Sequence, residues 1–135
     1  MRFSVVGLAA ILATTVSASP IELLLDRKNW VATATGNNAS AGLAIDYDSG
    51  TSWQNGYPQN GNEWFNVTFP NSITFNQLVL SGNAGDYPRG LSVYIYPSAS
   101  GNPTIITPTS TVSGGIFTYD LQGTQQGVSL CLHVG

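Results

Sequence analysis

The sequence predicts an all-β domain, folded as an antiparallel sandwich or barrel. Three observations predict it. In most regular stretches, apolar and polar residues alternate with a period of two, as in half-buried strands. Gly, Pro and Asn interrupt the chain too often for a helix of useful length, since 15 Gly and 7 Pro occur among 135 residues. The predicted strands are short and separated by regular turn signals, which is typical of sandwiches and barrels.

The predicted elements follow one another without an internal repeat or a linker. We expect strands at 30–35, 64–69, 73–80, 91–96, 104–107, 116–121 and 128–134. Loops rich in Gly and Asn lie at 36–40 and 81–90, and Pro70-Asn71-Ser72 is expected to turn the chain between two strands. The pattern therefore predicts one domain.

The first 18 residues have the pattern of a secretory signal peptide. Arg2 gives a positive start, an apolar run covers Val5 to Ala13, and Val16-Ser17-Ala18 places small residues where a signal peptidase cuts. We predict a signal peptide at 1–18 and a secreted, extracellular domain at 19–135. The alternative is a buried first strand or helix. The apolar run is shorter than the roughly 20 residues that cross a bilayer, so we expect no membrane span.

Charged residues are scarce, at 8% of the chain, and the net charge is −3. Without Arg2, three basic residues remain against seven acidic ones, which gives a net charge of −4. The sequence holds no basic cluster that would suit a nucleic acid. The many Asn, Thr, Ser and Gly residues suit a neutral polar ligand instead.

Cys131 and His133 are the only cysteine and the only histidine. A single cysteine forms no internal disulfide. Two residues apart on a predicted strand, the two side chains would share one face. A catalytic thiol needs an activating base and an electropositive setting, and nothing else in the sequence supports that arrangement. We interpret Cys131 as a strand residue and predict no enzymatic activity.

Two N-glycosylation acceptors occur, in Asn38-Ala39-Ser40 and Asn66-Val67-Thr68. Asn38 lies in a predicted loop. Asn66 lies in a predicted strand, so its side chain must face outward to be glycosylated. Both agree with a secreted glycoprotein.

Four motifs occur in a fixed order: NWVATA at 29–34, AIDYDSGTSW at 44–53, EWFNV at 63–67 and DYPRGLSVY at 86–94. They resemble the W-x-x-x-A-S, A-I-D-G-D-x-x-T-x-W, W-x-x-V-D-L-G and Y-P-R-G-Y-x-V-Y patterns of the discoidin family. This family is also called the coagulation factor 5/8 type C or galactose-binding-like domain, and carbohydrate-binding modules of family 32 belong to it. The resemblance implies an eight-stranded jelly-roll sandwich.

The sequence departs from the family pattern at several positions. Tyr47 stands where the family has Gly, and Ser52 replaces a frequent Arg. Thr68-Phe69-Pro70 replaces the D-L-G ending of a strand. The chain ends at Gly135, before the family's aromatic-rich loop and its last, acid-bearing strand. Two interpretations stay open: the chain lacks that strand, or it closes the sheet differently.

The turn after Ala44 concentrates oxygen atoms. Asp46 and Asp48 are two residues apart, and Thr51 follows three residues after Asp48. A Ca²⁺ ion takes six to eight oxygen ligands, and such a turn can supply several. Asx-turn chemistry, in which side-chain oxygens bind backbone N–H groups, is the alternative. Catalysis fits poorly, because glycosidase carboxylates flank a bond several Å apart.

The resemblance implies which atoms of this turn would bind calcium. The side chains of Asp46 and Thr51 would contribute oxygens, and so would the backbone carbonyls of Leu43, Asp48 and Thr51. The family's late acidic ligand has no counterpart in this sequence.

The resemblance also implies that ligands bind loops at one end of the sandwich. A sugar site needs an aromatic face and fixed hydrogen-bonding groups. We predict Tyr57, Asn83, Asp86 and Arg89 as the ligand-binding residues. The alternatives are an ordinary exposed Tyr57 and an Arg89 that pairs with Asp86 or with loop carbonyls. The three tryptophans, Trp30, Trp53 and Trp64, are expected in the core.

These observations predict a secreted, monomeric, non-catalytic module that binds a glycan or polysaccharide, with calcium as a structural ion. Two alternatives remain: a truncated or accessory part of a secreted glycoside hydrolase, and an adhesive surface protein that binds protein or lipid. The second would be favoured by an exposed apolar spike, and the predicted loops carry no Leu, Ile or Phe of that kind.

Overall fold

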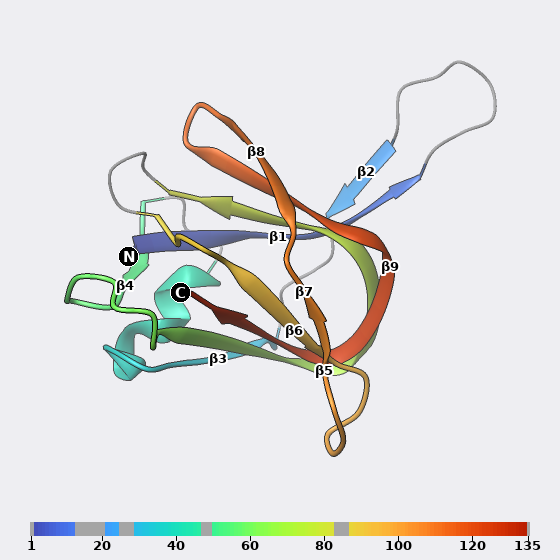
Figure 1. Ribbon diagram of the computed structural model, residues 1–135, viewed down its shortest axis with the longest axis horizontal. Coiled ribbons are helices and arrows are strands. Elements are labelled where there is room, and N and C mark those ends of the chain that lie inside the picture. Colours follow the sequence, from blue (N-terminus) through green and yellow to red (C-terminus); the bar gives the residue numbers. More distant parts are fainter. Residues whose placement is uncertain (1, 13–20, 25–28, 47–49, 83–86, 135) are drawn as a thin grey trace.

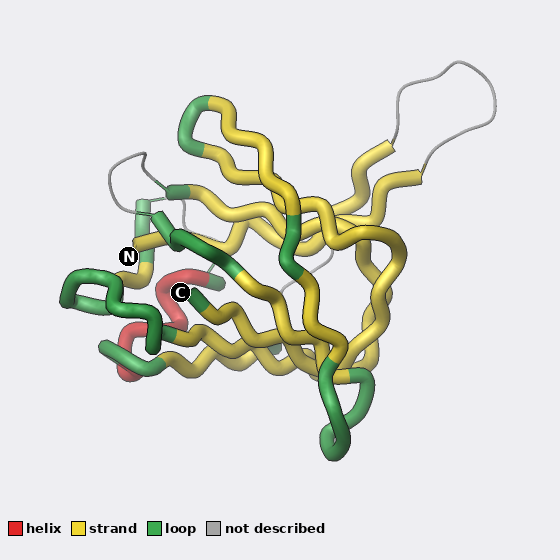
Figure 2. The backbone as a smooth tube through the Cα atoms, viewed as in Figure 1, coloured by secondary structure: helices red, strands yellow, loops and turns green. Residues whose placement is uncertain are grey.

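The computed structural model describes residues 2–12, 21–24, 29–46, 50–82 and 87–134. Strands account for most of these residues, and one short helix interrupts them (Figure 2). The elements are β1 (Arg2–Leu12), β2 (Ile21–Leu24), β3 (Val31–Ala34), the 3₁₀ helix η1 (Asn38–Ala44), β4 (Trp53–Gln54), β5 (Trp64–Ser81), β6 (Ser92–Tyr96), β7 (Thr104–Ile106), β8 (Thr109–Ser113) and β9 (Ile116–His133). The pairings between these strands are all antiparallel.

Two long strands, β5 and β9, form the frame of the fold. They pair from Trp64 opposite His133 to Ser81 opposite Ile116, with two interruptions of register. The first interruption includes Pro70, which cannot donate a ladder hydrogen bond. At the second, Gln122 and Gly123 adopt positive φ values of 58° and 109°. Such bulges bend a strand, and Figure 1 shows both strands curving at the same side of the molecule.

The bends divide the strands into two layers. The first layer contains β3, the first half of β5, the second half of β9, β6 and β7. The second contains β8, the first half of β9, the second half of β5, and β1, with β2 and β4 on β1. The predicted all-β antiparallel sandwich is therefore confirmed.

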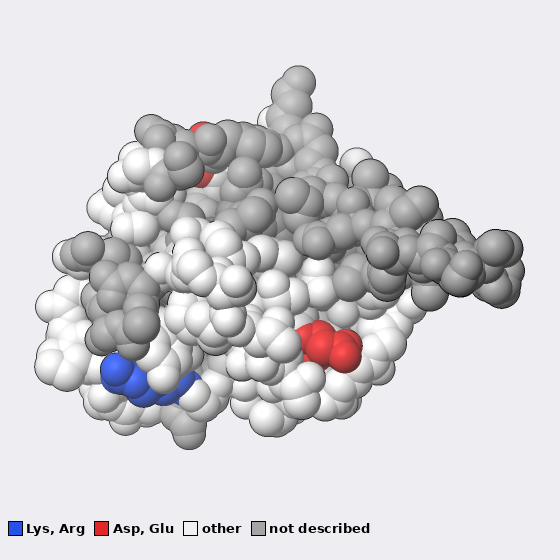
Figure 3. Space-filling view, turned by 90° about the horizontal axis from the view of Figure 1, so that it is seen from above, with Lys and Arg blue, Asp and Glu red and all other residues white. Residues whose placement is uncertain are grey.

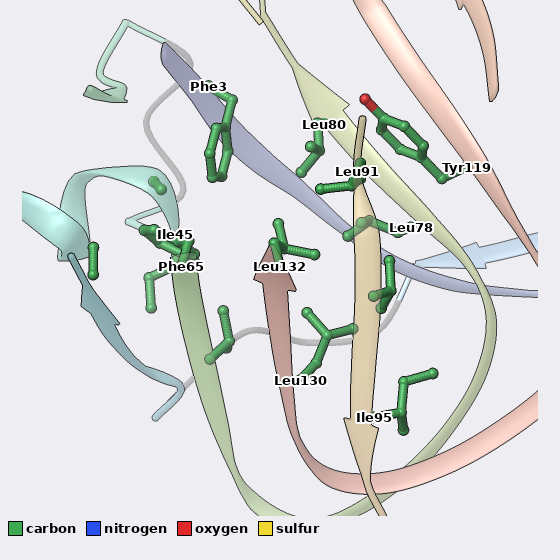
Figure 4. Close-up of a cluster of buried hydrophobic side chains, with 14 of the residues drawn as sticks. Phe3, Ile45, Phe65, Leu78, Leu80, Leu91, Ile95, Tyr119, Leu130 and Leu132 are labelled. Atoms are coloured by element: carbon green, nitrogen blue, oxygen red, sulfur yellow. The ribbon is translucent and has the colours of Figure 1, made fainter. Parts of the chain in front are cut away.

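The core lies between these layers. Alternate residues of each strand point inward, such as Val93 and Ile95 on β6 or Leu130 and Leu132 on β9, and these side chains are at most 3% exposed. Figure 4 shows Leu130 and Leu132 in one cluster with Phe65, Leu78 and Leu80. Full burial of such a side chain contributes about 1.5–3 kcal/mol.

Residues 2–12, inside the predicted signal peptide, form strand β1. It pairs with residues 77–81 of β5 and with β4. Phe3 is 1% exposed, and its ring packs edge-on against Trp53 and Phe65, with centroids 5.4 and 5.1 Å away. The structure thus contains a first strand, as in the alternative interpretation, and the Phe3 side chain on it is buried. Residues 13–20 lie outside the described residues, and cleavage near Ala18 stays a prediction that would remove this strand.

Beyond the N-terminal segment, the structure differs from the sequence prediction in five elements. The pairs of strands predicted at 64–69 and 73–80, and at 116–121 and 128–134, are continuous bent strands. The segment predicted as a loop at 36–40 leads into η1, which buries Ala41 and Ala44. The short β4 was not predicted. Neither was β8, whose residues are all exposed and therefore show no alternation.

No helix among the described residues is long and apolar enough to cross a membrane.

Candidate functional site

Two loops meet at one end of the sandwich through the side chain of Gln59. Its Nε2 donates to the carbonyl of Tyr87 at 2.5 Å, and its Oε1 accepts from the backbone N–H of Arg89 at 2.9 Å. One amide thus joins the loop between β4 and β5 to the loop between β5 and β6. The sequence predicted that both loops carry the ligand site, but it did not single out Gln59.

The loop between β4 and β5 is also held by the carboxylate of Glu63, a residue that is 1% exposed. Its carboxylate accepts the backbone N–H groups of Asn60 at 2.7 Å and Gly61 at 3.0 Å. Burial acts to raise the pKa of Glu63, but hydrogen bonds from the backbone of residues 60–63 favour the anion, and the pKa is lowered overall. A buried anion therefore fixes the shape of this loop.

In the second loop, Arg89 is exposed but restrained. Its guanidinium carbon lies 5.1 Å from the ring centroid of Tyr87, and the Tyr87 ring stacks on Phe117 at 5.1 Å with an interplanar angle of 22°. Arg89 therefore has a structural partner in the Tyr87 ring. Asp86, the partner that the sequence suggested, lies outside the described residues. The guanidinium N–H groups can still donate to a ligand.

An open groove of about 770 Å³ lies beside these residues. Its lining includes Tyr87, Arg89, Ser110, Val112, Phe117 and Tyr119. Burial, with a smaller contribution from nearby Tyr87, raises the pKa of Tyr119 to about 12, so its hydroxyl stays protonated at neutral pH. The groove thus combines aromatic surface with hydroxyl groups and one cation, which is the mixture expected of a sugar site.

Tyr57 lies in the same loop as Gln59, and it is 39% exposed. Its ring lies over the backbone of Gly36, where a Cβ atom would come within 2.9 Å of Tyr57 Cε1 and 2.6 Å of the Asn55 carbonyl oxygen. The carbonyl of Gly36 in turn accepts from the Trp53 indole at 2.9 Å. The turn before η1 therefore positions Tyr57. Asn83 and Asp86, the other predicted ligand residues, lie outside the described residues.

Three of the four predicted calcium ligands lie together. Thr51 Oγ1 is 2.7 Å from both carboxylate oxygens of Asp46 and 3.2 Å from the Leu43 carbonyl oxygen. Carboxylate, hydroxyl and carbonyl oxygens are the kinds of ligand that Ca²⁺ takes, and calcium binding at this turn stays a prediction. Asp48, like Tyr47, lies outside the described residues.

Nothing in the described residues resembles a transition-metal or nucleophilic centre. No group of three or more His, Cys, Asp and Glu side chains gathers there. Burial raises the pKa of Cys131 to about 11 and lowers that of His133. At neutral pH the thiol is protonated and therefore a poor nucleophile.

Trp30 and Trp53, which are 8% and 0% exposed, lie in the core as predicted. Trp64 does not: it is half-buried, because its neighbour Phe65 takes the inward position on β5. The prediction was wrong there because Trp64 lies on the outer face of the strand.

The two predicted glycosylation acceptors differ in setting. Asn38 is exposed at the start of η1, and its Oδ1 accepts from the backbone N–H of Ala34 at 2.9 Å. Asn66 is half-buried on β5, and its Nδ2 lies 3.3 Å from Thr68 Oγ1. Glycosylation of either residue stays a prediction.

The chain has the fold of β-sandwich carbohydrate-binding modules of known structure. No protein-family model and no curated protein sequence matches the chain. Chitosan-binding module 1 of a chitosanase/glucanase from Paenibacillus sp. IK-5 matches in a crystal structure of a point mutant. The TM-score is 0.63 at 22% identity, over 78% of this chain and 81% of that one.

Two further structures from the same enzyme agree with this match. The solution structure of module 1 has a TM-score of 0.60 at 24% identity, over 76% of this chain and 81% of that one. Chitosan-binding module 2, in complex with chitotriose, has a TM-score of 0.59 at 15% identity, over 80% of this chain and 83% of that one. At these identities the similarity establishes the fold.

Proposed function

We propose that this protein is a non-catalytic carbohydrate-binding module of the discoidin-like type. In this proposal it is secreted and binds a polysaccharide through the loops at 55–62 and 87–90. The observation that carries the proposal is the link made by Gln59, which joins both loops beside an open aromatic groove. Tyr57 and Arg89 are the proposed contacts, together with Asn83 and Asp86, which precede the second loop in the sequence.

Chitosan is the first ligand to test. The structural neighbours are named as chitosan-binding modules, and one of them was solved with chitotriose. Chitosan carries amino groups that are cationic in mild acid, and the net charge of −3 attracts a polycation. Figure 3 shows one face of the molecule, where the charged side chains of the described residues lie in small, separate patches. The long-range attraction should therefore be modest and weaken with salt.

Calcium is proposed as a structural ion of the turn at 43–51. Asp46, Thr51 and the Leu43 carbonyl would hold it, together with Asp48. The crowding of oxygens around the Thr51 hydroxyl supports this assignment. The ion would order the turn that leads into Trp53 and β4; no catalytic step involves it.

A panel of immobilised glycans tests the proposed function. We expect the purified protein to bind at least one polysaccharide, and Tyr57→Ala or Arg89→Ala to weaken binding about tenfold, which corresponds to about 1.4 kcal/mol. Asn71→Ala, an exposed change at the bend of β5, should bind like the parent protein. A folded protein that binds no glycan on the panel would refute the proposal.

A further inference from the structure

The outer face of the first layer carries aromatic side chains that the proposed loop site does not use. The strand register places Trp64, His133 and Ser92 in one row across β5, β9 and β6. A parallel row contains Thr68, Ser129 and Tyr96. Residues in register on adjacent strands share one face. The core residues Phe65 and Leu132 belong to the opposite face.

The middle row of this face is polar at its centre. Thr33, Asn66, Cys131 and Tyr94 follow one another across β3, β5, β9 and β6. The rings of Tyr94 and His133 contact each other, with centroids 4.1 Å apart and planes 33° apart. This contact holds the imidazole beside Trp64, its partner on β5.

The face carries a shallow, open depression. A depression of about 500 Å³ is lined by Thr33, Trp64, Asn66, Tyr96, Ser129 and His133. Ser98 and Ala99, in the loop between β6 and β7, line it as well. Figure 1 shows that this loop projects beyond the end of the first layer. Residues of this loop therefore border the depression on one side.

The chemistry of the lining favours an uncharged sugar chain. Trp64 and Tyr96 line the depression with aromatic surface that suits the apolar side of a pyranose, and the neighbouring hydroxyl and amide groups can bind its hydroxyls. Among the described residues that line it, none is Asp, Glu, Lys or Arg. Burial lowers the pKa of His133, so its imidazole is neutral at pH 7.

The two ring platforms lie at opposite corners of the depression. From Trp64 to Tyr96 the path crosses two inter-strand spacings and runs four residues along a strand. With strands about 4.8 Å apart and about 3.3 Å per residue, the diagonal is roughly 16 Å. That length suits several consecutive sugars of an extended chain rather than a single monosaccharide.

We propose that this outer face is a second carbohydrate-binding surface, which takes a segment of an extended, uncharged polysaccharide between Trp64 and Tyr96. The inference rests on the proposed function for the class of ligand, and it assigns a different set of residues. Asn66 adds a consequence. A glycan attached to Asn66 would fill the same depression, so the surface is available only where this residue is unmodified.

The test is affinity electrophoresis of unglycosylated protein in gels that contain neutral, soluble β-glucan or xylan. We expect at least one of these polysaccharides to retard the protein. Trp64→Ala and Tyr96→Ala should each weaken this binding at least tenfold. Ile116→Ala, an exposed apolar change on the second layer, should leave it unchanged. Trp64→Phe, which keeps a flat ring, should retain a substantial part of the affinity.

The loop variants separate this inference from the proposed function. Arg89→Ala should keep most of the binding to the neutral polysaccharide, and that binding should be insensitive to salt. If folded Trp64→Ala and Tyr96→Ala bind as well as the parent while Arg89→Ala does not, the second surface is refuted and the loop site stands. If Trp64→Ala does not fold, Tyr96→Ala decides. If the protein binds neither neutral polysaccharide, the second surface is overturned. If it binds no glycan on the panel, both proposals are overturned.

Discussion

At the scale of the residue, single polar side chains hold the two loops of the candidate site in shape. Gln59 joins two loops with two hydrogen bonds, and Glu63 holds one of them with its carboxylate. Both residues were visible in the sequence, inside or beside the predicted loop. Their roles were not, because a Gln or Glu in a polar loop looks the same whether it binds solvent or a distant backbone. By contrast, the contact between Asp46 and Thr51 was predictable, because residues of one short turn lie close together in space.

The first prediction concerns Glu63. Glu63→Gln keeps one acceptor oxygen but points an amide at the second backbone N–H group, so we expect the variant to be less stable by about 1–2 kcal/mol at pH 7. Urea unfolding of both proteins measures this difference. Asp120→Asn, which changes an exposed carboxylate, is the matched control.

The effect of Glu63 should also depend on pH. Its pKa is lowered in the folded state, so its contribution is fully present above the ordinary value of 4.5 and is lost as the pH falls through the folded-state pKa. The parent protein should therefore lose more stability than Glu63→Gln between pH 6 and pH 3. Equal losses for both proteins would contradict a hydrogen-bonded Glu63 anion.

At the scale of the element, the sequence predicted where strands occur better than where they end. The alternation on β6 and on both halves of β5 marked them clearly. Pro70 and Gly123 were signs of interruption, and a sequence does not reveal whether such a residue ends a strand or bends it. The turn between β8 and β9 is easier to read from the sequence, because it contains two consecutive glycines. Gly114 and Gly115, with φ values of 58° and 81°, form this two-residue hairpin turn.

The second prediction tests this hairpin. Gly115→Ala should destabilise the protein by about 1–2 kcal/mol, because an L-residue is strained at positive φ. Its Cβ would also lie 2.9 Å from the Gly82 carbonyl oxygen. Gly42→Ala is the control, since a Cβ there meets nothing within 4 Å. Thermal unfolding measures the melting temperature of both variants and of the parent protein. A Gly115→Ala variant that melts at the same temperature as the Gly42→Ala control would contradict the turn geometry.

The third prediction concerns the turn at 43–51. If it binds calcium, EDTA should lower the melting temperature by several degrees and added Ca²⁺ should restore it, because an ion that binds the folded state stabilises it. Asp46→Ala should abolish the response. An unchanged melting temperature in EDTA would instead mean that Asp46 and Thr51 serve only to hold the turn.

At the scale of the whole molecule, the sandwich depends on how the N-terminal segment is used. The composition of residues 1–18 fits a signal peptide, while the structure pairs β1 with the edge of β5 and packs Phe3 against Trp53 and Phe65. Local sequence does not distinguish these cases, because an apolar segment serves both purposes. The long-range pairing of β1 with β5 could not be predicted from local alternation either.

The fourth prediction uses Phe3 to decide between a cleaved signal peptide and a retained strand β1. If the folded protein retains β1, Phe3→Ala should destabilise it by about 3–5 kcal/mol, the usual cost of removing a buried phenylalanine. The mass of the protein from a secreting host should then include residues 1–18. A secreted form that begins near residue 19 and remains fully stable would show that β1 is dispensable.

Calorimetric titration with chitooligosaccharides tests the central claim, polysaccharide binding through the joined loops, most directly. We predict saturable binding by the parent protein, and at least tenfold weaker binding by Gln59→Ala, whose loops are no longer linked. The Asn71→Ala control should match the parent. Gln59→Ala that is folded and binds with full affinity would contradict the role of the loop junction. A parent protein that binds neither these oligosaccharides nor any polysaccharide of the glycan panel would contradict the function itself.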